Sequence, residues 1–180
     1  MNKNYIETNR LIIRRFEEID IDDIFECCQN PNLGNNAGWK PHESKEESLA
    51  ILKSFFIESE NNVWAVVLKE TDRIIGSIGL VPDPKRENPH SGMLGYWLKE
   101  SCWGKGYMSE ATQAVLKFGF STLNLNLVTA NCYPHNERSQ QVLKRNGFVY
   151  EGLLHQAEVT YDEKVLDHLC YYLTKEEYIK

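Results

Sequence analysis

The sequence predicts an α/β fold built on a mixed sheet whose first part is largely antiparallel. Two observations lead to this fold class. The predicted elements follow the order strand, two helices, three strands, helix, strand, helix, two strands, and helices separate the later strands so that the chain can cross over the sheet. A doubly wound nucleotide-binding fold is not expected, because its strands and helices would alternate from the start. The length of 180 residues and the apolar content of 42% suffice for one sizeable core, so we expect a single domain over residues 1–180.

The first predicted strand is "RLIIRRF" at 10–16, and a short acidic helix, "DIDDIFECCQN" at 20–30, comes after it. Pro31 ends this helix, because proline lacks the N–H that a helix interior requires. The following stretch, 31–43, is rich in turn-forming residues and is expected to be a loop.

A capping box and a hairpin follow. Ser44 has Glu47 three residues later, which predicts the start of a helix that runs to about Ser59. Two runs rich in β-branched residues come next, at 63–70 and 73–81. The short turn between them predicts an antiparallel hairpin.

The second half of the chain is predicted to hold a strand, a helix, a strand, a helix and two closing strands. Three prolines in the loop 82–91 exclude a continuous strand or helix there. The first of these helices has its apolar residues on one face. The second begins at Asn136, a typical N-cap, and ends at Gly147, the residue expected at a left-handed C-cap. The predicted ranges are 92–100, 109–123, 126–133, 136–148, 148–158 and 164–174.

Charge and composition exclude several classes of protein. The net charge of −6 argues against a general nucleic-acid-binding protein, whose electrostatic footprint is a basic face. The polar N-terminus has no apolar signal region, and no stretch approaches the roughly 18 apolar residues of a membrane span. We therefore expect a cytoplasmic protein with no membrane partner. The five cysteines have no C-x-x-C spacing, which predicts reduced thiols and no metal site.

The glycine-rich stretch "ESCWGKGYMSEA" at 100–111 lies between a predicted strand and a predicted helix. Such a turn exposes backbone N–H groups at the positive end of the helix dipole, so it can bind an anion. It is not a P-loop, because Tyr107 follows the second glycine and the earlier glycine is missing. It is not a dinucleotide fingerprint either, since Ser109 stands where the third glycine belongs. A tight turn that binds nothing is the alternative.

Two longer segments carry a resemblance to a known family. "LGYWLKESCWGKGYMSEA", followed by "ANCYPHNERSQQVLKRNGFVYEG", resembles the GNAT superfamily of acetyl-coenzyme A-dependent N-acetyltransferases. The chain looks most like the RimJ/RimL-like branch, whose members often open with a segment similar to "IETNRLIIRRF". The resemblance extends from about residue 5 to residue 178. It implies a mostly antiparallel sheet of about seven strands, about four flanking helices, and a V-shaped splay between the fourth and fifth strands.

The resemblance implies acetyl-coenzyme A as co-substrate. In the superfamily motif Q/R-x-x-G-x-G/A, Trp103 takes the first position, Gly106 the glycine and Met108 the last position. Trp103 and Met108 therefore differ from the residues that the motif expects. In the family, this motif binds the pyrophosphate of the co-substrate mainly through main-chain N–H groups, and Lys105 could add a cation. The strand at 96–98 resembles the one that pairs with pantetheine and donates N–H groups to the thioester carbonyl; a plain core strand is the alternative. The residues expected to bind the co-substrate are Tyr96, Trp97, Leu98, Trp103, Gly104, Lys105, Gly106, Tyr107, Met108, Ser109, Asn136 and Ser139.

The same resemblance implies two catalytic residues. Asn136 and Ser139 match an N-x-x-S pattern that contacts the pantetheine arm, although ordinary helix capping has the same spacing. The tyrosine that many members use as an acid is replaced by Leu143. In this branch the serine is the proposed acid and a glutamate nineteen residues later is the proposed base, which points to Ser139 and Glu158. The alternatives are a merely positional Ser139 and a solvated Glu158.

The acceptor side is expected to involve loops. The segment 31–43 with Trp39 and the loop 82–91 should line the acceptor entrance, because loops on a rigid scaffold carry specificity. Simple packing of Trp39 is the alternative. His168 is expected to be a structural strand residue, whereas His155 and His90 could face the acceptor.

The predicted activity is direct acetyl transfer to a primary amine, either a protein N-terminus such as that of a ribosomal protein or a small molecule. The acidic net charge would attract a basic acceptor such as a ribosomal protein or a polyamine. A non-catalytic acetyl-coenzyme A sensor is the leading alternative, and an acyl-coenzyme A hydrolase or a carrier of longer acyl groups is a third. No metal is expected, and a homodimer is a possible assembly.

Overall fold

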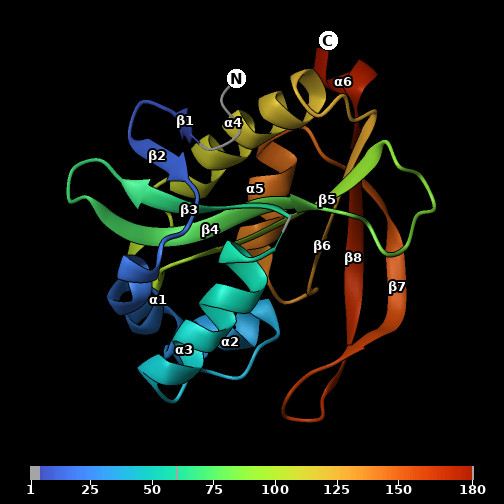
Figure 1. The fold of residues 1–180 in the computed structure, drawn as a ribbon. Coiled ribbons are helices and arrows are strands. Elements are labelled where there is room, and N and C mark those ends of the chain that lie inside the picture. The colour runs from blue at the N-terminus through green and yellow to red at the C-terminus, as the bar shows by residue number, and fades with distance from the viewer. Residues whose placement is uncertain (1–4, 60, 180) are drawn as a thin grey trace.

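The computed structural model describes residues 5–59 and 61–179, and it confirms the predicted mixed α/β fold. The strands of these residues form one sheet with the order β1-β2-β3-β4-β5-β6-β8-β7, in which only β5 and β6 are parallel neighbours (Figure 1). The sheet has eight strands instead of about seven, because the three-residue β1 is too short to produce a recognisable pattern. The strands are β1 (Tyr5–Glu7), β2 (Leu11–Arg14), β3 (Asn62–Leu68), β4 (Arg73–Val81), β5 (Ser91–Leu98), β6 (Leu127–Cys132), β7 (Val149–Val159) and β8 (Val165–Thr174).

Helices cover both faces of the sheet. Helices α1 to α3 gather on one face and α4 and α5 lie on the other (Figure 1). A π-type turn at Leu52–Ile57 continues α3. None of the described helices is long and apolar enough to cross a membrane. The α-helices are α1 (Ile21–Cys28), α2 (Pro31–Ala37), α3 (Lys45–Ile51), α4 (Tyr107–Ser121), α5 (Glu137–Arg145) and α6 (Lys175–Ile179).

Helix α2 corrects the expectation of a loop at 31–43. The Asn30 side chain accepts a hydrogen bond from the N–H of Asn32 at 2.8 Å, and Pro31 occupies the first helical turn, where a missing N–H costs nothing. Gly38 ends the helix with a φ of +84°. The sequence contains both capping residues, Asn30 and Gly38, but the glycine and asparagines between them are weak helix formers, so no helix was predicted.

Strands β5 and β6 separate partway along their length. Their parallel pairing runs from Ser91↔Leu127 to Leu94↔Ala130. Beyond that point β5 stays paired with β4 as far as Leu98, while β6 follows β8. This is the predicted V-shaped splay, since β5 and β6 are the fourth and fifth predicted strands. Among residues 5–59 and 61–179, no strand pairs with the β6-side edge of the β5 backbone at 95–98.

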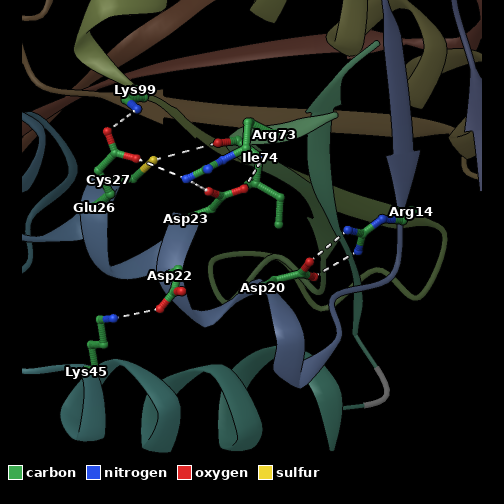
Figure 2. Close-up of polar contacts among 10 residues, drawn as sticks. All are labelled: Arg14, Asp20, Asp22, Asp23, Glu26, Cys27, Lys45, Arg73, Ile74 and Lys99. Atoms are coloured by element: carbon green, nitrogen blue, oxygen red, sulfur yellow. Dashed lines mark hydrogen bonds and ion pairs between the residues drawn. The ribbon is translucent and has the colours of Figure 1, made fainter. Parts of the chain in front are cut away.

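Acidic residues fasten α1 to the sheet (Figure 2). The carboxylate of Asp23 accepts a hydrogen bond from the N–H of Ile74 in β4 at 2.8 Å. Glu26 forms an ion pair of 2.6 Å with Lys99, just after β5. Both carboxylates also contact Arg73 (Figure 2). These contacts hold α1, and with it the adjoining α2, against β4 and the end of β5.

Candidate active site

The glycine-rich turn before α4 exposes its backbone. Gly104 and Gly106 have φ values of +75° and +79°, in the left-handed region that favours glycine. Within the described part of the chain, the N–H groups of residues 104–106 have no backbone acceptor. The first N–H groups of α4, which begins at Tyr107, have none within the helix either. A Cβ on Gly104 would meet nothing within 4 Å, so the space over the turn is open. The turn therefore suits an anion.

A cleft of about 490 Å³ extends from this turn along β5 to the start of α5. The structure brings together at its walls every predicted cofactor-binding residue except Lys105, whose side chain lies outside the lining. The predicted residues that line this cleft, called the cofactor cleft below, are Tyr96, Trp97, Leu98, Trp103, Gly104, Gly106, Tyr107, Met108, Ser109, Asn136 and Ser139.

Two arginines that the sequence reasoning missed also line the cofactor cleft. Arg138 and Arg145 are seven residues apart on α5, a spacing that places both on one face of a helix. The guanidinium of Arg138 lies 4.8 Å from the centre of the Trp103 ring. The indole of Trp103 donates a hydrogen bond to the Leu98 carbonyl at 2.6 Å, which ties the turn to the end of β5. The cleft thus combines free amides with two cations.

Ser139 and Tyr96 meet at the far end of the cofactor cleft. The hydroxyl oxygens of the two residues lie 2.9 Å apart, and the Tyr96 hydroxyl is also 3.2 Å from the Ser139 carbonyl. The side chain of Asn136 caps α5 by accepting from the Ser139 N–H at 3.1 Å, and its amide donates to Asn36 of α2. Burial raises the pKa of Tyr96, so its hydroxyl keeps its proton. Leu143, at the position of the missing tyrosine, is fully buried.

A second cavity of about 340 Å³ lies across the splay and is called the acceptor cavity below. It shares walls with the cofactor cleft at β5, α2 and the start of α5, so the two spaces meet where β5 and β6 diverge. Trp39 lines this cavity, whereas the loop 82–91, which was expected beside it, contributes no lining residue. Both predicted catalytic residues, Ser139 and Glu158, line this cavity.

Two side chains donate to the Glu158 carboxylate, and neither was predicted to do so. The Tyr133 hydroxyl and Nε2 of His168 each lie 3.0 Å from Oε2 of Glu158. A carboxylate oxygen accepts, so the Tyr133 hydroxyl and the Nε2–H tautomer of His168 are the donors. Burial, with a further contribution from Glu158, raises the pKa of Tyr133, so its hydroxyl stays protonated. His168 thus lines the cavity rather than serving only the strand, whereas His155 points to solvent and pairs with Asp167.

Glu158, which lines the acceptor cavity, directly follows an irregular part of β7. The pairing of β7 with β8 skips between Leu154↔His168 and Glu158↔Leu166, and Gln156 within this bulge has a φ of +49°. A bulge re-aims the side chains that follow it. Tyr133 directly follows β6 and His168 lies in β8, so the linear sequence gives no signal for their meeting with Glu158. No group of three or more histidine, cysteine, aspartate or glutamate side chains within the described ranges could hold a metal ion.

Residues 10–149 match a family described as the acetyltransferase (GNAT) domain. The chain belongs to this GNAT family. The uncharacterised N-acetyltransferase YoaA of Bacillus subtilis is 30% identical to it over 154 residues, 84% of this chain and 86% of that protein. The ribosomal-protein-serine acetyltransferase of Escherichia coli is 37% identical over 140 residues, 75% of this chain and 76% of that protein.

A solved GNAT structure shares the fold. Spermidine N-acetyltransferase from Vibrio cholerae, in complex with CoA and spermine, superimposes with a TM-score of 0.79 and 21% identity, covering 96% of this chain and 100% of that chain. The GNAT fold uses acetyl-coenzyme A, and the residues of the cofactor cleft fit such a molecule. Open space over left-handed glycines, free amides and two arginines suit a diphosphate. The unpartnered β5 edge suits an arm that carries amide groups.

Proposed function

We propose that this chain is an acetyl-coenzyme A-dependent N-acetyltransferase of the RimJ/RimL-like type that acts on a primary amine. One observation carries the proposal: the cofactor cleft and the acceptor cavity meet at the splay. Ser139 lines both of them, and Glu158 lines the acceptor cavity beside it. When bound, acetyl-coenzyme A supplies the thioester whose acetyl group passes to the amine as the thiol departs. A ternary complex needs this arrangement, in which both substrates are held together.

The proposed chemistry divides between the two walls. Glu158 takes the proton of the attacking amine, directly or through water, and the donors Tyr133 and His168 keep its Oε2 in place. The backbone N–H groups of β5 are positioned to donate to an oxygen on which negative charge develops. Ser139 can give a proton or a hydrogen bond to the departing sulfur, and water replaces a proton that is given. The adjacent Tyr96 hydroxyl keeps its own proton and lies within hydrogen-bond distance of the Ser139 hydroxyl, which it holds in place.

The state of Cys132 supports direct transfer over a covalent acyl-cysteine. Its thiol lines the acceptor cavity and is the cysteine nearest to the proposed reaction. Burial raises the pKa of Cys132 to about 11, so the nucleophilic thiolate is scarce at neutral pH. The acetyl group is therefore expected to pass to the amine in one step.

The acceptor is proposed to be a protein N-terminus or a small amine. The similarity to a ribosomal-protein-serine acetyltransferase supports the first, and Glu158, the carboxylate in the acceptor cavity, suits either amine. The test measures thiol release from acetyl-coenzyme A with peptides that have free N-terminal serine or alanine, polyamines and amino sugars. The same peptides with acetylated N-termini are the matched control.

Turnover with at least one free amine, and none with its acetylated counterpart, is the expected result. Tight binding of coenzyme A without turnover on any acceptor would contradict the proposed enzyme and support the alternative, a non-catalytic acetyl-coenzyme A sensor. Thiol release in the absence of any amine would indicate a hydrolase instead.

A further inference from the structure

The segment just before β2 is fastened to the first turn of α4, although about a hundred residues separate them in sequence. The Thr8 hydroxyl and the Arg10 N–H donate to Oε1 of Glu110 at 2.6 and 2.8 Å. Nε of Arg10 forms an ion pair with the other carboxylate oxygen at 2.7 Å. Burial works to raise the pKa of Glu110, but these hydrogen bonds outweigh it and hold the pKa below its usual value. Glu110 therefore stays ionised and holds the Arg10 side chain in place.

The guanidinium of Arg10 lies directly behind the glycine-rich turn. Its Nη1 donates to the Lys105 carbonyl at 3.0 Å, and its Cζ lies 4.5 Å from the centre of the Tyr107 ring. A Cβ added to Gly106 would lie 3.5 Å from Nη2. Arg10 itself does not line the cofactor cleft, whereas Gly106 and Tyr107 do. The arginine thus touches the turn from outside the cofactor cleft.

The contact with the Lys105 carbonyl fixes the direction of an amide. The carbonyl of Lys105 and the N–H of Gly106 belong to one planar peptide group, and in a trans peptide these two bonds point in opposite directions. Because Arg10 holds the Lys105 carbonyl, the Gly106 N–H points away from Arg10, and Gly106 itself lines the cofactor cleft. A glycine-rich turn has little stiffness of its own, since glycine populates several backbone regions.

We infer that Arg10 is a positioning residue that orients the Lys105–Gly106 peptide toward the diphosphate of the co-substrate. The same guanidinium neutralises Glu110, a carboxylate in the helical turn that the diphosphate would approach. The inference rests on the proposed function, because it requires acetyl-coenzyme A in the cofactor cleft. It also assigns a role to the N-terminal "TNR" segment, which neither cavity uses.

The test compares Arg10→Met with wild type by calorimetric titration of coenzyme A. Methionine keeps an unbranched side chain over Tyr107 but removes the side-chain donors to Oε2 of Glu110 and to the Lys105 carbonyl, while the Thr8 hydroxyl and the backbone N–H of residue 10 still donate to Oε1. We expect the Kd for coenzyme A to rise about tenfold, the effect of losing one charge-assisted hydrogen bond. Pantetheine, which has no diphosphate, is titrated with detection by nuclear magnetic resonance, and its affinity is expected to stay unchanged.

Arg15→Met is the matched control. Arg15 also donates to backbone carbonyls, those of Asn61 and Val63 at 2.6 and 3.2 Å, but it lies at the other end of β2 and outside the cofactor cleft. Its substitution should leave the Kd for coenzyme A unchanged. Arg10→Lys provides a second variant, because lysine keeps a cation beside Glu110 but lacks the fork that reaches both acceptors. It should weaken binding of coenzyme A as Arg10→Met does.

The outcomes separate this inference from the proposed function. If the wild-type chain does not bind coenzyme A, the proposed function fails. If wild type binds and both Arg10 variants bind equally well, the positioning role alone is overturned. An equal loss of affinity for coenzyme A and pantetheine would also overturn it, because that result indicates a general structural defect rather than an effect on the turn.

Discussion

Replacing Glu158 with glutamine is expected to lower kcat/KM for acetyl transfer by about a hundredfold, the usual contribution of a general base. Glutamine keeps the size of the side chain and an oxygen that can accept from Tyr133 and His168, but it cannot take a proton. Because Glu158 does not line the cofactor cleft, the Kd for coenzyme A should not change. Initial rates with the best acceptor of the amine panel, together with calorimetry, check both expectations.

Glu151→Gln is the control for this substitution. Glu151 lies on the same strand, pairs with Arg86 and lines neither cavity, so its loss should leave kcat/KM unchanged. Equal rates for wild type and Glu158→Gln would remove Glu158 from the mechanism, while acetyl transfer itself would remain established.

Replacing Gly38 with alanine is expected to disturb the same carboxylate from the opposite wall. The added Cβ would lie 2.4 Å from the Tyr133 hydroxyl and 2.7 Å from Oε1 of Glu158, so both side chains would have to move. A displacement of about 1 Å at a reacting group can cost about a hundredfold in rate, and we expect a loss of that order in kcat/KM. The left-handed φ of +84° adds about 1 kcal/mol of lost stability.

Gly147→Ala separates the two effects. Gly147 also follows a helix with a φ of +82°, but its added Cβ would approach nothing closer than a Leu173 methyl group at 3.8 Å. We expect a similar loss of unfolding free energy and no change in kcat/KM. Urea unfolding and initial rates on both variants measure the two quantities. If both variants lost kcat/KM to the same extent, the loss in Gly38→Ala could not be assigned to displacement of Glu158, and this prediction would be wrong.

Local signals in the sequence predicted most of the elements in their order along the chain and the glycine-rich turn, whereas the splay was implied by the family resemblance. Gly104 and Gly106 occupy left-handed backbone positions, which few other residues tolerate, so their spacing carries structural information. Asn136 and Ser139 form the predicted cap and also line both cavities, so the two alternative interpretations of their spacing are compatible.

Contacts between distant elements could not be predicted in the same way. Tyr133, His168 and Glu158 come from three separate segments, and a bulge in β7 sets the direction of the last of them. Arg138 and Arg145 look like ordinary surface residues until α5 is placed beside the turn. Their role depends on tertiary packing, which periodicity and spacing do not specify.

The most direct test of the account is a crystal structure of this chain with coenzyme A. The account predicts the diphosphate on the N–H groups of residues 104–106 and the start of α4, with the pantetheine arm paired to the β5 backbone beyond Leu94. Coenzyme A bound at another place, with the glycine-rich turn empty at a saturating concentration, would contradict it.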